Sequence, residues 1–562
     1  MKKYRWQLLI LFLTGLVVGT LLILEKRGGI GQLGTPQPVS GGVYTEALIG
    51  SLSRLNPLLD SSNQVDRDVD RLIFSGLVKF DSRGMPEPDL AESIRPSQDG
   101  MIYNVTLRDK LTWHDGEPLT TADIAFTVSL LQSGDGYISS DLVAFWKEIK
   151  LVVLDDLNMQ FILPDAFAPF QDYLAFGILP NHLLSGKSIK EIADSGFNLE
   201  PVGSGPYQFS ELTVENDVIT GLTLKAFTKN STSGPFLEEI YFRYYADAKS
   251  AYQAYVDKYV QGISEIPDEM LASALNNQNL SVYTGRLPQI SMVLFNLNDP
   301  ALPFFQDASI RRALLLGLNR QRLVNDLFNG QAIVANGVIF PDSWAYLDTM
   351  PTVEYDPDQA AMLLKEAGYV ITGDTNPVRM KEDVALRFVL DYPDDDLHRM
   401  IAESIQSDWK KLSIDVMLEA VPADIFVKDK LTPRAFQAAL VDLNLSRTPD
   451  PDPYPFWDSS QATTGQNYSQ WNNRLASDSI EQARVTMDFA ERTRLYHNFQ
   501  AIFEQELPSL PLYYPVYNYG VDSVIQGVSL GPLMDTSDRF ATVSKWYMTA
   551  RRAQGTETPA SK

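Results

Sequence analysis

The N-terminal segment constrains this chain more than any other feature. Three basic residues among the first five precede a run from Trp6 to Leu24 that contains no charged side chain. A helix of this length spans about 28 Å, close to the hydrocarbon core of a bilayer. No small-x-small cleavage site follows the run, which continues into Glu25-Lys26-Arg27. The segment therefore predicts an uncleaved signal anchor, with a cleaved signal peptide as the alternative.

An anchor of this kind fixes the side of the membrane on which the rest of the chain lies. Because positive N-termini stay in the cytoplasm, everything from about Gly41 onward is expected to be extracytoplasmic or periplasmic. Residues 25–40 are rich in Gly and contain Pro36 and Pro38, which is typical of a linker. They include Gly29-Ile30-Gly31-Gln32-Leu33-Gly34, but a dinucleotide motif needs a strand before it and a helix after it. We therefore interpret 25–40 as a linker.

Composition excludes several classes of protein. The 562 residues carry a formal net charge of −24, which repels phosphate backbones and excludes nucleic acid as a partner. The chain has no cysteine, so it has no disulfide, thiolate metal site or cysteine nucleophile. With 44% hydrophobic residues it has enough apolar material for packed cores, and its length favours three or four domains.

Local patterns predict a mixture of helices and strands, so the fold class is α/β. Residues 101–108 alternate in the manner of a strand, and Thr121 can cap a helix that follows. Helical spacing recurs at Ile310 to Leu318, after Asp358 and from Leu397 to Leu412. Strands are expected at Ala385 to Leu390 and Ser413 to Leu418, and a last helix before Pro508.

Acidic and histidine residues give no metal motif. The stretch Asp66-Arg67-Asp68-Val69-Asp70 begins like a calcium loop but lacks the glycine and glutamate such loops need, so we interpret it as a solvated helix face. Asp394-Asp395-Asp396 is expected to cap the helix beginning near Leu397. The four histidines (114, 182, 398 and 497) have no zinc-ligand spacing. The sequence predicts no metal and no cofactor.

Six segments, in order along the chain, resemble one protein family. The longest runs from Tyr103 to Arg108 and on through Trp113-His114-Asp115-Gly116 to Phe126. It resembles the signature of the family 5 extracellular solute-binding proteins, the peptide-, nickel- and sugar-binding receptors of ABC importers. The others are Leu55-Asn56-Pro57-Leu58 with Leu72 to Leu77, Gly203-Ser204-Gly205-Pro206-Tyr207, Asp307 to Leu314, Asp356 to Gly368, and Leu510 to Tyr513.

The resemblance implies a periplasmic-binding-protein-like flytrap with two lobes and an extra third domain. Lobe I would combine 41–75, 190–285 and 505–550, with a small accessory domain at 76–189 and lobe II at 286–504, after the 1–24 anchor and 25–40 linker and before a 551–562 tail. Pro201 to Pro206 and Leu287-Pro288 are the expected crossing points between domains. The solute would bind between the lobes, which close on it.

The resemblance also implies candidate ligand-binding residues. The Pro-rich segment that follows the strand ending near Asn444 resembles the family's cleft-lining strand and Asp-Pro-Asp turn. From the opposite lobe we expect Ser61, Ser62 and Gln64; from this segment and its continuation we expect Arg447, Asp450, Asn467 and Trp471. An alternative is that Asp450 and Asn467 only brace loops.

Arg447 is where the chain departs from its relatives. Peptide-binding members usually place an aspartate about three residues before this Asp-Pro, where it holds the ligand's ammonium group. Here that position is Arg447, which repels an ammonium and attracts a carboxylate. We expect this receptor not to require a free N-terminus, unless the Pro-rich insert brings Asp450 or Asp452 to the ammonium site.

The sequence therefore predicts a receptor and not an enzyme, since it contains no G-x-S-x-G and no H-E-x-x-H motif. The predicted function is to capture a small solute, by default an oligopeptide, and deliver it to an ABC permease in the membrane. The protein is expected to be a monomer. The alternatives are a receptor of the same fold used for sensing or scavenging, and an extracellular hydrolase.

Overall fold

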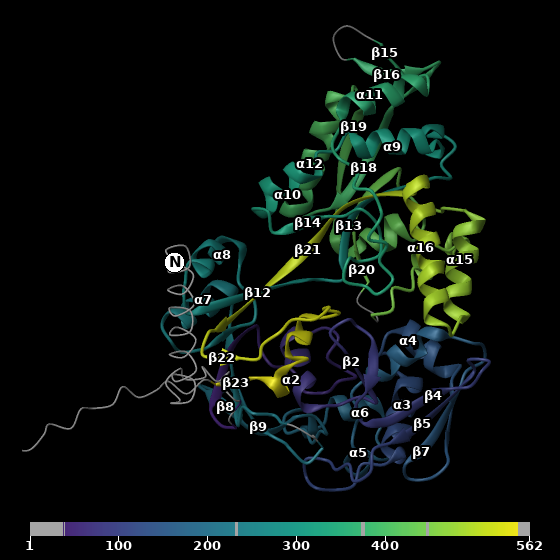
Figure 1. Cartoon of the computed structure of the whole chain (residues 1–562). Helices are drawn as coiled ribbons and strands as arrows, with labels where there is room; N and C mark the ends of the chain where they lie inside the picture. The colour runs from purple at the N-terminus through teal and green to yellow at the C-terminus, as the bar shows by residue number, and fades with distance from the viewer. Residues whose placement is uncertain (1–37, 39, 231–233, 373–376, 446–448, 549–562) are drawn as a thin grey trace, which may run out of the picture.

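The computed structural model describes residues 38, 40–230, 234–372, 377–445 and 449–548. The molecule has two lobes, one above the other in Figure 1. The middle of the chain forms the upper lobe, and its earlier and later parts form the lower lobe. The predicted anchor at 1–24 and most of the predicted linker lie outside the described residues. Within the described ranges, no helix has both the length and the apolar character that crossing a membrane requires.

One twelve-stranded sheet continues through both lobes. Most of its pairs are antiparallel, but β1 lies parallel to β10 and to β11, and β18 parallel to β19 and to β20. The lower lobe contributes β1 (Val43–Ile49), β8 (Tyr207–Glu215), β9 (Val218–Ala226), β10 (Glu239–Tyr245), β11 (Gly262–Ile263) and β12 (Leu280–Arg286). The upper lobe contributes β13 (Gln289–Phe295), β14 (Ala332–Val334), β18 (Arg387–Pro393), β19 (Asp415–Val421) and β20 (Ala438–Asn444), and β21 (Ser509–Asp522) belongs to both.

Strand β21 joins the lobes. Its C-terminal part pairs with β12 as far as Arg286, and its N-terminal part pairs with β13 from Ser291 onward. The chain thus passes between the lobes at Leu287-Pro288 and again along β21 (Figure 1). Leu287-Pro288 was a predicted crossing point, and the structure confirms it. The other predicted crossing point, Pro201 to Pro206, leads into β8 inside the lower lobe and so does not lie between these two lobes. As a crossing between smaller domains it stays a prediction.

The lower lobe contains a second, four-stranded sheet. It is built from β4 (Ala91–Pro96), β5 (Ile102–Leu107), β7 (Asn158–Ile162) and β6 (Lys150–Val153). Its neighbours are the hairpin β2 (Val78–Phe80) and β3 (Pro86–Pro88), the helices α3 (Thr121–Ser133), α4 (Ser140–Lys147), α5 (Asn181–Leu184) and α6 (Ile189–Ala193), and the 3₁₀ helices η1 (Ala168–Ala175) and η2 (Gly196–Asn198). One apolar core connects this sheet to β1, with Trp113 and Trp146 fully buried in it.

The rest of the lower lobe surrounds β1 and the last segment of the chain. It consists of α2 (Gln64–Ile73), α7 (Ala248–Val256), α8 (Asp268–Leu275), η6 (Thr536–Phe540), η7 (Val543–Lys545) and the pair β22 (Ile525–Gln526) and β23 (Tyr547–Met548). Helices α7 and α8 enclose a smaller core against β1 that includes Ala47 and Ile263.

The upper lobe buries both faces of its sheet. Along β13, Val293 and Phe295 join one core while Ile290, Met292 and Leu294 join the other, because successive strand residues point to opposite faces. Helices α9 (Ala308–Leu316), α10 (Arg320–Phe328), α11 (Pro357–Glu366) and α12 (Asp396–Lys411) border the first core, and α14 (Tyr454–Trp457), α15 (Arg474–Val485) and α16 (Phe489–Glu506) the second. The remaining elements are η3 (Pro303–Gln306), α13 (Ala423–Ile425), η4 (Phe426–Leu431), η5 (Ser459–Gln461) and the strands β15 (Val370–Thr372), β16 (Val378–Lys381) and β17 (Val384–Ala385).

The helices and strands predicted from local patterns are present, so the α/β class is confirmed. The strand expected at 101–108 is β5, and the helix expected near Leu397 is α12. Asp395 caps α12, since its carboxylate accepts the His398 N–H at 2.9 Å. One cap differs from the expectation. Thr120, not Thr121, caps α3, because its side chain and that of Asp123 satisfy each other's backbone N–H groups.

The prediction of a solvated face at Asp66–Asp70 is wrong. Asp66, Asp68 and Asp70 are 1–2% exposed on α2. Asp66 accepts the N–H groups of Ser53 and Arg54, and the Oδ2 of Asp70 accepts the Asn56 N–H at 2.9 Å. These partners lie outside the helix, so helical spacing alone could not reveal them.

Asp68 belongs to a fully buried ion group around Arg539. The Arg539 guanidinium contacts both Asp68 oxygens at 2.7 and 2.8 Å, and its Nε donates to Glu46 at 2.9 Å. The hydroxyls of Tyr44 and Tyr519 donate to the same Glu46 carboxylate at 2.6 and 2.7 Å. This group ties the C-terminal segment to β1 and α2 in the lower lobe.

Candidate functional site at the junction of the lobes

Two cavities meet where the lobes approach each other. The larger has a volume of about 470 Å³ and the smaller about 40 Å³. Gly84, Pro449, Pro532 and Met534 line both of them. Pro449 comes from the upper lobe and the other three from the lower lobe, so the common boundary of the two cavities is made by both lobes.

The larger cavity lies mainly in the lower lobe and combines aromatic and charged walls. Phe74, Phe80, Phe227 and Phe540 line it together with four cations, Arg71, Lys79, Arg108 and Lys545, and four acids, Asp81, Glu87, Asp89 and Asp538. Arg71 pairs with Asp538 at 3.2 Å, and Lys79 lies 3.6 Å from Glu87. Mixed apolar and charged walls suit a solute that carries both apolar parts and charges.

The smaller cavity is next to the crossing strands. Arg286, Leu287 and Pro288 line it at the first crossing, and its upper-lobe lining consists of Val338, Ile339, Phe340, Asp342, Ser343, Leu445, Pro449 and Pro451. Arg286 forms an ion pair with Asp342 there.

Ser61, Ser62 and Gln64 lie at the start of α2. Ser61 and Ser62 are exposed, and Gln64 donates to the Asp535 carboxylate at 2.7 Å, next to the cavity-lining Met534. Arg67 holds the turn by donating to the Ser61 carbonyl at 2.8 Å and pairing with Asp535 at 3.0 Å. The structure places Ser61 and Ser62 in the turn before α2 and Gln64 at the first position of that helix. None of the three lines the two cavities, and their contact with a solute stays a prediction.

Asp60, just before this turn, was not among the predicted residues. Burial raises its pKa to about 7, an effect only partly offset by the positive charge of Arg67. It is therefore the carboxyl of this turn whose charge changes near neutral pH.

Asp450 lies beside the shared boundary of the cavities and is 5% exposed. It forms an ion pair with Arg492 of α16, and the Tyr496 hydroxyl donates to its Oδ1 at 3.0 Å. Its own N–H donates to Asp172 of the lower lobe at 2.9 Å. Asp450 thus braces the loop in which it lies and contacts the opposite lobe at the same time.

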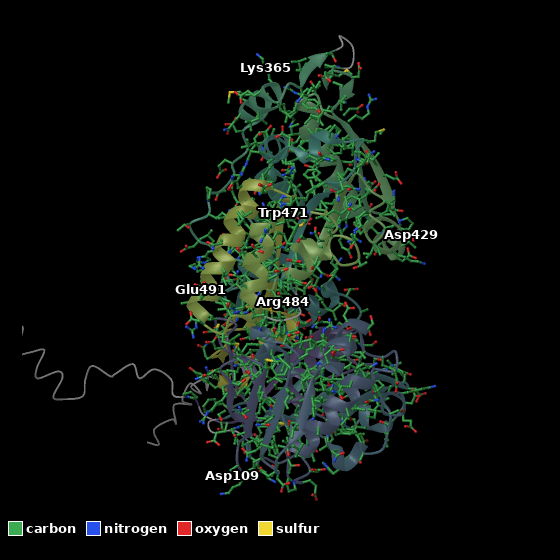
Figure 2. The ribbon with its side chains drawn as sticks, turned by 90° about the vertical axis from the view of Figure 1, so that its right-hand side faces the viewer. Asp109, Lys365, Asp429, Trp471, Arg484 and Glu491 are labelled. Carbon is green, nitrogen blue, oxygen red and sulfur yellow. The ribbon has the colours of Figure 1, made fainter. Side chains whose placement is uncertain are left out.

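Asn467 and Trp471 lie together inside the upper lobe. The Asn467 amide donates to the carbonyls of Asp458 and Trp471 at 2.9 and 2.8 Å, and its oxygen accepts the Trp471 N–H at 3.0 Å. The Trp471 ring packs against Trp457 and Phe503, well above the junction in Figure 2. Neither lines the two cavities, and their contact with a solute stays a prediction. Arg447 lies outside the described residues.

The structure brings together residues that sequence reasoning did not connect. His398 of α12 lies between Asp395 at 2.6 Å and Asp442 of β20 at 3.2 Å. Burial alone would lower the pKa of His398, but Asp442 and Asp395 outweigh it and raise that pKa. The only advance signal was Asp395 three residues before His398, because Asp442 is distant in sequence.

In the part of the chain that the structure describes, no cluster of His, Cys, Asp and Glu is arranged to hold a metal ion.

Comparison with known proteins adds independent evidence. Residues 85–466 match the family described as bacterial extracellular solute-binding proteins, family 5. The oligopeptide-binding protein AppA of Bacillus subtilis (strain 168) is 26% identical over 522 residues, covering 91% of this chain and 92% of that protein. The dipeptide-binding protein of Escherichia coli (strain K12) is 25% identical over 543 residues, covering 90% and 97%.

A solved structure agrees with the fold. That of HbpA2 from Haemophilus parasuis superposes with a TM-score of 0.79 at 20% identity, and covers 91% of this chain and all of that one. At this identity the likeness concerns the fold, and it extends over both lobes.

Proposed function

The chain belongs to the bacterial extracellular solute-binding proteins of family 5, a family of binding proteins rather than enzymes, and we propose that its solute is an oligopeptide held between the two lobes. Both curated relatives described above are named for peptide ligands. In this family the bound solute is passed to an ABC permease, which is the expected partner here.

The observation that carries this proposal is the position of the cavities. They share a boundary formed by Pro449 from one lobe and Gly84, Pro532 and Met534 from the other. The strands that join the lobes, β12 to β13 and β21, lie beside the smaller cavity, so a hinge at this point would change its width. A solute bound here would contact both lobes.

Within this proposal the predicted residues have two roles. Ser61, Ser62 and Gln64 approach the solute from the lower lobe, and Arg447 from the upper lobe. Asp450 holds the proline-rich loop through Arg492, while Asn467 and Trp471 support that loop from inside the upper lobe. The support for this division is that Ser61 and Ser62 are exposed, whereas Asp450, Asn467 and Trp471 are buried.

We also propose the domain division with lobe I at 41–75, 190–285 and 505–550, a small domain at 76–189 and lobe II at 286–504. It is supported by the strands: β1, β8 to β12 and the end of β21 share one part of the large sheet, while β4 to β7 form their own. Limited proteolysis should cut first between these units, and early cuts inside them would contradict the division.

The bulk of the protein is extracytoplasmic, as its family implies, and we propose that residues 1–24 anchor it in the membrane. The support is the charge-free apolar run in the sequence. The full-length protein should sediment with membranes, and N-terminal sequencing should begin at Met1. A mature N-terminus near residue 30 would contradict the anchor.

Calorimetry tests the proposed ligand class directly. The full-length protein, titrated with peptides of two to nine residues, should bind at least one length class, and mass spectrometry should recover every peptide uncut. A receptor holds its ligand without chemical change, whereas a hydrolase would release fragments. No binding by any peptide would contradict the peptide proposal, and cleavage would contradict the receptor itself.

A further inference from the structure

The lobes meet at a second place, away from the strands that join them. The end of the α15–α16 pair and the loop at 449–452 of the upper lobe lie against η1 and the residues just before it in the lower lobe. Arg484, labelled in Figure 2, lies at this contact, close to the lower lobe. We call this the docking contact: it consists of Tyr103, Phe167 and Asp172 of the lower lobe and Asp450, Asp452, Tyr454, Arg484, Met487 and Arg492 of the upper lobe.

Part of the docking contact is apolar. Met487, between α15 and α16, packs against the core of the lower lobe, where the Tyr103 hydroxyl lies 3.9 Å from its sulfur. The Arg484 guanidinium lies 5.0 Å from the centre of the Phe167 ring and 4.2 Å from that of Tyr454. These contacts hold the end of the helix pair on the lower lobe through dispersion and cation–π attraction.

The other part is ionic, and it contains more carboxylates than guanidinium groups. Asp172 of the lower lobe accepts the Asp450 N–H at 2.9 Å, while Asp450 pairs with Arg492 and Asp452 with Arg484 at 3.2 Å. Within the described ranges, Asp172 makes no ion pair. In the part of the chain that the structure describes, the buried carboxylates of Asp172 and Asp450 and the partly buried carboxylate of Asp452 lie beside the guanidinium groups of Arg492 and Arg484.

Asp172 is the group whose surroundings depend most on docking. It is 8% exposed, and its main neighbours, Asp450 and Arg492, belong to the opposite lobe. Burial raises its pKa well above the ordinary value, and the negative charge of Asp450 raises it further. If the lobes separated, water would surround the Asp172 carboxyl and screen it from Asp450. Its pKa would then return toward the ordinary value.

We propose that the docking contact is an acid-favoured latch, in which seating the upper lobe on the lower one takes up a proton at Asp172. The docked state is then most stable, relative to the undocked state, at low pH. Its relative stability falls as the pH rises through the range in which Asp172 of the docked protein ionises. Because one proton is taken up, the ratio of docked to undocked protein changes by at most about tenfold per pH unit.

The other charged groups that the structure describes at the contact do not reverse this direction. Burial raises the pKa of Tyr103, on β5, to about 12, so it stays neutral near pH 7. From the upper lobe, Arg492 stays cationic because Asp450 raises its pKa despite burial, and Tyr496 of α16 stays neutral because burial raises its pKa. Burial raises the pKa of Asp452 to about 6 despite its Arg484 partner, so any proton it gains on docking acts in the same direction.

The absence of native cysteine allows a direct test. Cysteines introduced at Asp109 of the lower lobe and Asp429 of the upper lobe, both exposed, accept one dye each for single-molecule energy transfer (Figure 2). In the ligand-free full-length protein, the docked fraction should rise as the pH falls from 8 to 5. Asp172→Asn keeps an oxygen that accepts the Asp450 N–H but cannot be charged, so its docked fraction should be high and nearly independent of pH.

Asp165→Asn is the matched control, because Asp165 is an exposed aspartate on the same segment and should respond like the wild type. If circular dichroism shows that Asp172→Asn is misfolded, Asp172→Ser, which also lacks a charge, replaces it. An equal pH response in the wild type and the uncharged variant would overturn the proposal, and so would a wild type whose docked fraction does not change with pH. Binding of peptides is measured separately, so failure of the latch leaves the proposed receptor function intact.

Discussion

Replacing Arg539 by methionine is expected to lower the free energy of unfolding of the lower lobe by about 3–5 kcal/mol. The guanidinium is fully buried and is the cation that faces both Glu46 and Asp68, each of them buried as well. Methionine fills similar space but leaves two carboxylates without a compensating charge. Chemical denaturation followed by tryptophan fluorescence measures the loss, since Trp546 packs on Tyr44 and Tyr519 in the same core.

A matched substitution separates the buried ion group from a general effect of removing arginine. Arg474 pairs with Asp478 on α15 with 90% of its side chain exposed, so Arg474→Met should cost less than about 1 kcal/mol. Adding Glu46→Gln and Asp68→Asn to Arg539→Met should recover part of the loss, because the buried charges are then gone. Equal, small losses for the two arginine variants would show that the buried group does not stabilise the lobe.

Acetylating the N-terminus of a bound peptide is expected to leave its affinity unchanged to within about threefold, less than about 0.7 kcal/mol. In a receptor that pairs a buried carboxylate with the ligand's ammonium, the same change costs about 2–5 kcal/mol, or at least about 30-fold. The expectation rests on Arg447 at the position where peptide-binding members usually have an aspartate. It is supported by Asp450 and Asp452, whose carboxylates are engaged by Arg492 and Arg484.

Calorimetry with paired free and acetylated peptides measures this difference. Arg447→Ala should weaken binding of peptides with a free C-terminal carboxylate more than binding of their amides, because it removes the cation that attracts the carboxylate. Arg474→Ala, at an exposed site far from the proline-rich loop in sequence, is the control and should change neither. Loss of binding on acetylation would mean that the Pro-rich insert brings Asp450 or Asp452 to the ammonium site after all.

The elements of this fold follow from local sequence, but its long-range pairings do not. The helices and strands were predictable because caps such as Asp395 and the alternation along β5 depend on neighbours a few residues away. The burial of Asp66, Asp68 and Asp70 was not predictable from local sequence, since the partner of Asp68 is Arg539, 471 residues further along the chain. Local sequence predicts that a run of charged residues is exposed to solvent, unless a distant residue of opposite charge is known to pair with it.

In the candidate site, too, local sequence predicted some features and missed the long-range pairings. The proline-rich segment, of which Pro449 borders both cavities, could be located from its sequence, whereas the contact of Ser61 and Ser62 with a solute stays a prediction. The pairing of Asp450 with Arg492 could not be predicted, because 42 residues separate them in sequence, and neither could its contact with Asp172, because that residue belongs to the other lobe. Sequence reasoning found the segments of the junction and missed which of their side chains hold it together.

The most direct test of the receptor account is the distance between the lobes before and after a peptide binds. With one dye at Asp109→Cys and one at Asp429→Cys, a bound peptide should move the molecules to a single state of higher energy transfer, in proportion to the occupancy measured by calorimetry. This follows because a solute held by both lobes stabilises the arrangement in which they are closest. A peptide that binds tightly while the energy transfer stays unchanged would contradict the account.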